Sequence, residues 1–231
     1  MKRFWKDVAL GADGGVTLDG RPVRTPGRAP LALPTAALAE AVADEWRAVD
    51  ETIDPRAMPL TGLANAAIDR IAADPTPFIT DIARYAETDL LCYRAHSPSE
   101  LVARQETAWE PLLDWARQRY DIHFATILGV MHVAQPDATL ARLAEAVAAR
   151  DPFTLAALQT IVSLTGTIVG SLALAEGAID AETLWRAAQV DEDWQAEQWG
   201  EDELATRARE AKRASYDAAV RFLAAVSAAR R

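Results

Sequence analysis

The stretch of sequence that decides the fold is residues 16–49, VTLDGRPVRTPGRAPLALPTAALAEAVADEWRAV, where the spacing of the apolar residues changes. Asp19-Gly20 separates the short runs Val16-Thr17-Leu18 and Val23-Arg24-Thr25, and an Asp-Gly pair in this setting predicts a β-hairpin. Thr35 favours the first position of a helix. After it the apolar residues follow helix spacing, at Leu38, Val42, Trp46 and Val49. The chain therefore changes from strands to helices at about residue 35.

The residues before this change read as one small antiparallel sheet. Strands are expected around Val8–Leu10 and Leu31–Leu33, and the glycine-rich residues 11–15 favour a turn. Pro22 has no backbone N–H, so it must lie on an edge of the sheet. A sheet this small is not stable alone, and it must therefore pack on the helices that follow.

The rest of the chain reads as a series of amphipathic helices, which begin where Asp, Ser or Thr can cap a helix or where Pro follows such a residue. The expected starts are Thr35, Asp74-Pro75, Ser97-Pro98, Asp151-Pro152, Asp180 and Asp202. In the ambiguous residues 121–134 we expect a short extended piece around Val130 and Val133. The fold class is therefore α+β, a small antiparallel N-terminal β module at residues 1–34 followed by a larger, mostly helical domain at residues 35–231.

One stretch of the helical part, residues 152–175, carries no charged side chain. It is long enough to cross a bilayer, and Gly166 and Gly170 have the spacing that allows helices to approach closely in membranes. Its many Ser, Thr and Gln side chains make it polar for a membrane span, however. We expect a central helix buried by its neighbours, with a membrane-associated subunit as the alternative.

Charge and cysteine content exclude several classes of protein. The chain of 231 residues has 34 Asp and Glu against 24 Lys and Arg, a formal net charge of −10 and a pI near 4.8. Nucleic acid binding is not expected, because phosphate contacts need a basic surface. Cys92 is the only cysteine, which suits a reducing compartment. Residues 1–10 contain no long apolar run, so we expect no signal peptide, no import leader and a cytoplasmic location.

Motifs of catalysis and ligand binding are not found. His96, His123 and His132 are not paired at helix spacing, and neither a Gly-x-Ser-x-Gly motif nor a phosphate-binding glycine loop occurs. Cys92 lies in an apolar run and is expected to be an inert core residue. We therefore expect no catalytic residue, no metal and no cofactor.

Two pairs of acidic side chains leave a hydrolase open as an alternative. Glu87 and Asp89 flank one residue, and Glu106 and Glu110 lie one helical turn apart. Two carboxylates can act together as general acid and base. In a chain with 34 acidic residues, however, such pairs arise by chance and are usually solvated.

The densest chemical feature is the acidic stretch 190–203, VDEDWQAEQWGEDE. Trp199-Gly200 predicts the end of a helix, with Gly200 in the left-handed αL conformation. Tryptophan is enriched in protein-binding hot spots, and a basic partner would relieve the repulsion between neighbouring acids. A solvated acidic face with Trp194 and Trp199 packed inward fits the composition equally well.

Several blocks along the chain together resemble one protein family, the assembly chaperones of the α subunit of the F(1) sector of ATP synthase. The blocks are Arg3-Phe4-Trp5-Lys6-Asp7-Val8, Leu18 to Pro26, Leu33-Pro34-Thr35, Ala43-Asp44-Glu45-Trp46, Met58-Pro59-Leu60-Thr61, Glu87 to Arg94, Gln105 with Trp109, Pro111 and Trp115, and Gln195 to Gly200. They occur in the family's order over nearly the whole chain. Residues 203–207 depart from the family's usual continuation, of which Glu203 and Ala205 alone match.

The resemblance implies a chaperone without an enzymatic step. Such a protein would bind the free α subunit and shield its β-facing surface until the α/β ring assembles. We expect a monomer that binds neither nucleic acid nor cofactor and does not insert stably into membranes. The residues expected to contact the partner are Asp191, Glu192, Glu197, Trp199 and Glu203.

Overall fold

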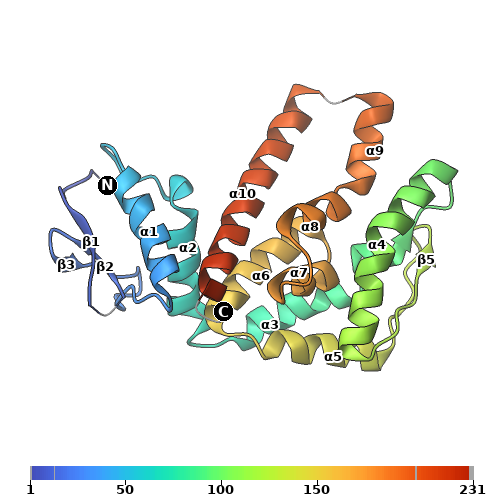
Figure 1. Ribbon diagram of the computed structural model, residues 1–231, viewed down its shortest axis with the longest axis horizontal. Coiled ribbons are helices and arrows are strands. Elements are labelled where there is room, and N and C mark those ends of the chain that lie inside the picture. Colours follow the sequence, from blue (N-terminus) through green and yellow to red (C-terminus); the bar gives the residue numbers. More distant parts are fainter. Residues whose placement is uncertain (1, 13, 201, 229–231) are drawn as a thin grey trace. The chain divides into compact units, whose positions relative to one another are not determined.

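The computed structural model describes residues 2–12, 14–200 and 202–228 (Figure 1). It confirms the α+β class, with a small antiparallel sheet near the N-terminus and helices through most of the remaining chain. Contacts between residues define two compact units. The first unit is Met1–Thr76, Asp151–Ala157 and Ala214–Arg231, and the second is Pro77–Arg150 and Leu158–Arg213. The division at residues 34 and 35 into two domains stays a prediction.

The sheet of the first unit contains three short antiparallel strands in the order β1-β2-β3. They are β1 (Val8–Leu10), β2 (Val16–Leu18) and β3 (Arg21–Pro22). Asp19 and Gly20 form the turn between β2 and β3 with φ of 48° and 76°, which confirms the predicted hairpin. Pro22 lies on an edge strand, as its missing N–H requires.

Two details of this module differ from the sequence prediction. The strand after the hairpin is Arg21–Pro22 and does not extend through Val23–Thr25, where only an isolated bridge joins Arg24 to Pro30. Likewise Leu31 and Leu33 form no strand, although Ala32 between them bridges to Gly15. Their side chains are nevertheless buried, because the chain here lies on the hydrophobic core.

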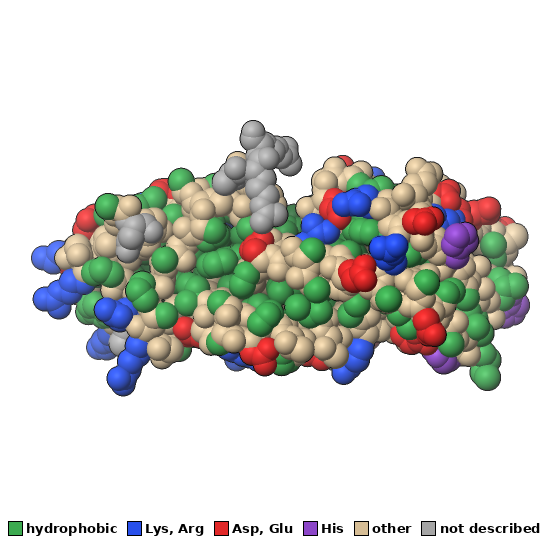
Figure 2. All heavy atoms as spheres, turned by 90° about the horizontal axis from the view of Figure 1, so that it is seen from below, with side chains coloured by type: hydrophobic (Ala, Val, Ile, Leu, Met, Phe, Trp, Pro, Cys, Tyr) green, Lys and Arg blue, Asp and Glu red, His purple; other side chains and the backbone are tan. Residues whose placement is uncertain are grey.

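Figure 2 shows Lys and Arg side chains gathered over this module.

The helices of the first unit begin with α1 (Ala36–Ala48) and continue with η1 (Pro55–Ala57), α2 (Pro59–Ala66) and the π-helical turn η2 (Ala67–Ile71). Thr35 caps α1 as predicted, since its hydroxyl accepts a hydrogen bond from the Leu38 N–H at 3.0 Å. The same hydroxyl donates to the Ala225 carbonyl at 2.7 Å. One side chain therefore starts α1 and ties it to the end of the chain.

Glu45 joins α1 to the start of α2. Its buried carboxylate accepts hydrogen bonds from the backbone N–H groups of Leu60 and Thr61, each at 2.8 Å, and from the Thr61 hydroxyl at 2.7 Å. The first N–H groups of a helix have no partner within the helix, so a carboxylate placed there satisfies them. Beside it the half-buried ring of Trp46 lies 5.3 Å from the buried ring of Trp5, in accord with a role in the core.

The second unit is built mainly of helices that pack around one long helix, α4. Its elements are α3 (Thr76–Ala83), η3 (Arg84–Ala86), η4 (Leu90–Cys92), β4 (Tyr93–Arg94), α4 (Ser99–Tyr120), β5 (Ile127–Leu128), α5 (Asp137–Ala148), α7 (Ile168–Ala175), α8 (Ala181–Ala188) and α9 (Val190–Trp199). Helix α4 contacts α7, α8 and α9. The extended piece predicted around Val130 and Val133 lies earlier, at β5, which pairs in parallel with β4.

The uncharged residues 152–175 form two helices where the sequence predicted one. Helix α6 (Pro152–Thr165) ends at Gly166, whose φ of 71° breaks the helical path, and α7 follows. Most of these residues are buried, as expected for a central element. A Cβ on Gly170 would lie 2.5 Å from the Leu184 side chain, so this glycine permits the close packing of α7 on α8. Among the described residues, no helix combines the length and apolar character needed to cross a bilayer.

Asp89 connects η4 to the start of α7. Its fully buried carboxylate accepts hydrogen bonds from the Leu91 N–H at 3.0 Å, the Thr167 hydroxyl at 2.9 Å and the Val169 N–H at 3.0 Å. Burial disfavours the charged form and raises the pKa of this carboxyl from 3.8 to about 6, although these hydrogen bonds act in the opposite direction. Two segments far apart in sequence are therefore held by one side chain.

The raised pKa of Asp89 predicts a pH dependence of stability. The folded protein binds this proton more tightly than the unfolded chain, so the stabilisation is fully present below pH 3.8 and is lost as the pH rises through about 6. The shift of the pKa from 3.8 to about 6 corresponds to about 3 kcal/mol in the free energy of unfolding. Titration of the Asp89 carboxyl by ¹³C NMR should show a midpoint near pH 6, and a midpoint below 4.5 would contradict it. The free energy of unfolding of Asp89→Asn, measured at pH 5 and 7.5, should not show the decrease that Asp89 causes in the wild type.

Candidate protein-binding site on α9 and α10

Helix α9 forms the acidic stretch singled out in the sequence. Three acidic side chains, Asp191, Glu192 and Asp193, lie in its first turn, where the positive end of the helix dipole favours them. Gly200 ends the helix with φ of 77°, but its ψ of 172° lies outside the predicted αL region. None of the ten residues of α9 is buried, so the helix is attached to the protein through side-chain contacts.

The first set of these contacts joins α9 to α4. Gln105 is buried; its Nε2 donates to the Asp191 carboxylate at 2.7 Å and its Oε1 accepts from the Ala95 N–H at 2.8 Å. Arg104 makes a two-point ion pair with Glu197 at 2.8 Å and lies over the Trp194 ring at 4.9 Å. The hydrogen bond from Arg104 lowers the pKa of Glu197. These contacts fix the position of α9.

The second set joins α9 to the first turns of α10 (Glu203–Ser227). Arg209 pairs with Asp193, and the Lys212 ammonium lies 3.9 Å from the Glu192 carboxylate. Asp202 starts α10 by accepting a hydrogen bond from the Ala205 N–H at 2.7 Å. The chain reverses direction between α9 and α10 (Figure 1), and opposite charges on the two helices face each other.

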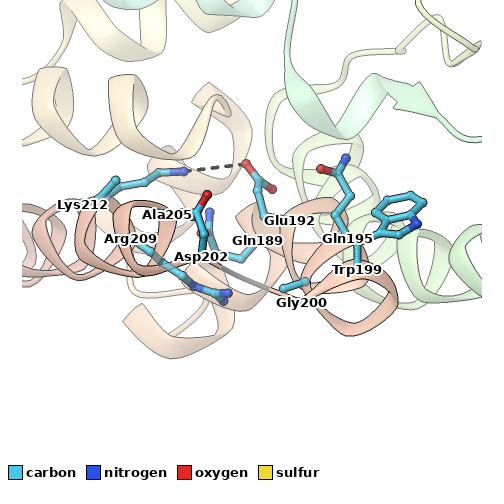
Figure 3. A pocket seen from close by; sticks show the side chains of 11 residues that line it. Gln189, Glu192, Gln195, Trp199, Gly200, Asp202, Ala205, Arg209 and Lys212 are labelled. Carbon is cyan, nitrogen blue, oxygen red and sulfur yellow. Dashed lines mark hydrogen bonds and ion pairs between the residues drawn. The ribbon is translucent and has the colours of Figure 1, made fainter.

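A cleft of about 430 Å³ lies between α9 and α10 (Figure 3). Lys212 and Trp199 lie toward opposite ends of it in this view. Trp199 is 78% exposed, which is unusual for so large an aromatic side chain and marks it as available to a partner. The cleft is lined by Gln189, Glu192, Gln195, Ala196, Trp199, Gly200, Asp202, Ala205, Ala208, Arg209 and Lys212.

The five residues expected to contact a partner occupy three different settings. Glu192 and Trp199 line the cleft, and Glu203 lies in the first turn of α10, exposed and 2.5 Å from Arg207. Asp191 and Glu197 instead bind Gln105 and Arg104 of α4. As contacts with a partner, all five stay predictions.

Sequence reasoning missed the part of the cleft that α10 supplies. Arg209 and Lys212 lie on one face of α10, and neither residue is among the five expected to contact a partner. The sequence does place these two cations one turn apart, directly after an acidic helix that ends in glycine. Which face of α10 meets α9, however, depends on how the two helices pack.

The carboxylates considered for a hydrolase have other contacts. Glu110 binds Arg94 at 3.0 Å and Arg117 at 2.6 Å, and Glu87 lies 3.1 Å from His132. Cys92 is buried as predicted, and burial raises the pKa of its thiol to about 12. Within the described residues, no group of three or more His, Cys, Asp or Glu is arranged to hold a metal ion.

Comparison with known proteins decides the family. The sequence model of the ATP12 chaperone protein matches residues 2–117. Atp12 from Paracoccus denitrificans is 43% identical, with a TM-score of 0.91 over 97% of this chain and 98% of that chain. This chain belongs to the ATP12 chaperone family. The family resemblance deduced from the sequence is thus confirmed.

Two further solved structures are also similar to this chain. A single-residue mutant of the Paracoccus Atp12 is 42% identical, with a TM-score of 0.90 over 97% of each chain. A protein from Agrobacterium tumefaciens described as a candidate chaperone is 46% identical, with a TM-score of 0.88 over 96% of this chain and 85% of that one. The similarity therefore extends over α9 and α10 as well.

The structure gives a physical reason for several blocks shared with the ATP12 family. Glu45 and Thr61 come from two of these blocks and bind each other. Asp89 and Gln105 each satisfy backbone N–H groups, and the buried Trp109 donates its ring N–H to the Ala187 carbonyl at 2.6 Å. These residues hold the scaffold, whereas the cleft lies beyond residue 117, where the family match ends.

Gln105 provides a test of how α9 is held. Gln105→Ala removes the hydrogen bonds to Ala95 and Asp191 and leaves the part-buried Ala95 N–H without this acceptor, so the loss of stability is about 2 kcal/mol. Denaturant unfolding should show this loss, and hydrogen exchange of the α9 amides should become faster. The neighbouring exposed residue gives a control, Glu106→Ala, which should change neither quantity. Unchanged α9 exchange in Gln105→Ala would contradict the assigned role.

Proposed function

We propose that this chain is an assembly chaperone of F-type ATP synthase that binds the free α subunit and shields its β-facing surface until the α/β ring assembles. The observation that carries the proposal is membership of the ATP12 chaperone family, with 43% identity to Paracoccus Atp12 over 97% of the chain. The α subunit as the partner follows from the family resemblance of the sequence blocks.

Shielding of this kind requires neither a catalytic step nor a cofactor. A subunit that waits for its ring partner exposes a large apolar surface, and such surfaces aggregate. A chaperone covers this surface and leaves when the β subunit binds it more tightly, because two partners for one surface exclude each other. The free energy for release then comes from α/β association.

The α9–α10 cleft is the proposed contact with α. Exposed Trp199 has the properties of a hot-spot residue, since it can bury a large area at little cost in side-chain entropy. Glu192 and Glu203 are exposed in the first turns of α9 and α10 and would attract a basic surface. Asp191 and Glu197 contribute by fixing α9 through Gln105 and Arg104.

We further propose that the protein acts as a monomer in the bacterial cytoplasm. Its similar structures come from bacteria, and the buried thiol of Cys92 suits a reducing compartment.

The proposal predicts selective capture of one subunit. The protein should be co-expressed with the α and β subunits of its own ATP synthase, each alone and both together. We expect it to retain α alone, to ignore β alone, and to lose α when β is added, because β competes for the same surface. Capture of neither subunit would reject the proposed function.

Substitutions in the cleft test the assignment of residues. Trp199→Ala should weaken α binding by about 10- to 100-fold, as loss of a hot-spot residue does. Glu203→Lys should weaken it by a smaller factor that shrinks at high salt. The matched control is Glu145→Lys, because Glu145 is an exposed acid on α5 that likewise pairs with an arginine of its own helix. Thermal unfolding should change little, since these side chains are exposed, and undiminished binding by both cleft variants would refute the assignment.

A further inference from the structure

A second surface of the second unit exposes apolar side chains that the fold does not use. Residues 128–133, LGVMHV, here named the apolar segment, begin at the last residue of β5. Leu128, Val130, Met131 and Val133 are 74%, 91%, 78% and 48% exposed. Of the eight large hydrophobic side chains exposed in the described part of the chain, half lie within these six residues. Such clustering is typical of an interaction surface, whereas single exposed apolar residues are ordinary.

The chain is held in place near the two ends of the apolar segment. The Gly129 N–H donates to the Arg94 carbonyl at 2.8 Å, which continues the pairing of β5 with β4. At the other end the buried side chain of Gln135 accepts from the Ala125 N–H at 3.0 Å and donates to the Ala125 carbonyl at 2.9 Å.

His132 fixes the middle of the segment. Its ring nitrogens lie 3.1 Å from the Glu87 carboxylate and 3.3 Å from the Tyr93 hydroxyl. These two contacts hold the His132 side chain against Glu87 and Tyr93, although the ring remains about half exposed, like the apolar side chains on either side of it. A segment ordered before binding loses less conformational entropy when a partner docks.

We propose that the apolar segment is a second docking site for the client protein, which it contacts through the client's exposed apolar surface. This inference rests on the proposed function, because a chaperone of unassembled subunits meets a partner with such a surface. Methionine is well suited to the task, since its flexible side chain adapts to irregular surfaces. Four side chains bury little area, so the contact is weak enough to be released when the true partner arrives.

The charge around the segment favours a protein client over a lipid surface or a second copy. Residues 121–136 contain no Lys or Arg, and Glu87 lies beside His132. Segments that bind anionic membranes combine apolar side chains with basic ones. A chain with a net charge of −10 also repels a second copy of itself.

The two docking sites would differ in physical character. The α9–α10 cleft is lined by charged groups of both signs, Glu192 and Asp202 with Arg209 and Lys212, so its contribution should fall as salt increases. The apolar segment contributes through burial of apolar area, which salt does not weaken. Because both belong to the second unit, one client bound at both sites would be held more tightly than by either alone.

The test uses the purified α subunit as the probe and the full chain with two neighbouring residues changed. Val130→Ser with Met131→Ser should weaken α binding by about 10- to 100-fold at both low and high salt, as loss of two apolar contacts implies. The matched control, Val130→Ile with Met131→Leu, keeps the apolar area and should bind like the wild type. All three proteins should unfold at similar temperatures, because both side chains are largely exposed.

The outcomes separate this inference from the proposed function. If the wild type does not bind α, the proposed function fails. If the wild type binds and the serine variant binds equally well, the apolar segment is not a docking site for this client. Two further measurements complete the test, namely binding of the protein to vesicles of anionic lipid and self-association of the protein alone, followed by sedimentation. Loss of vesicle binding or of self-association in the serine variant, with α binding unchanged, would assign the segment to those partners and overturn the proposal.

Discussion

The second unit depends on one buried carboxylate. Asp89 lies in the interior and receives hydrogen bonds from η4 and from the first turn of α7, which are separated by about eighty residues of chain. A buried carboxylate is costly unless donors surround it, and the free N–H groups at a helix start are costly unless an acceptor meets them. Each group thus relieves the cost of the other. The packing of α7 on α4 and α8 follows from where this contact places the helix.

Other buried polar side chains bind backbone N–H groups in the same way. Glu45 satisfies the start of α2, and Gln105 satisfies the Ala95 N–H while it holds Asp191 of α9. These contacts are directional, so they fix the register of elements that apolar packing alone would leave free to slide. They also explain why polar residues stand at buried positions in the sequence blocks by which the chain resembles the family.

The buried polar contacts and the exposed binding features lie on different parts of the structure, and this separation bears on function. The buried polar contacts build a firm scaffold, and the features suited to binding lie on elements attached to its outside. Helix α9 has no buried residue and is held by Gln105, Arg104 and the basic side chains of α10. The apolar segment is held at its two ends and through His132. A chaperone that must release its client gains from surfaces that are presented firmly but bury little area of their own.

The sequence by itself determined the local elements of this protein, its fold class and its family. The Asp19-Gly20 hairpin and the helix starts at Thr35 and Asp180 follow from backbone preferences and side-chain caps that act within a few residues. The tertiary structure alone decided which distant residues meet. It divided the uncharged stretch at Gly166, joined Gln105 to Asp191 across 86 positions, and brought α10 against α9 to form the cleft. Such contacts depend on how whole helices pack, and no pattern within a short window of sequence encodes that packing.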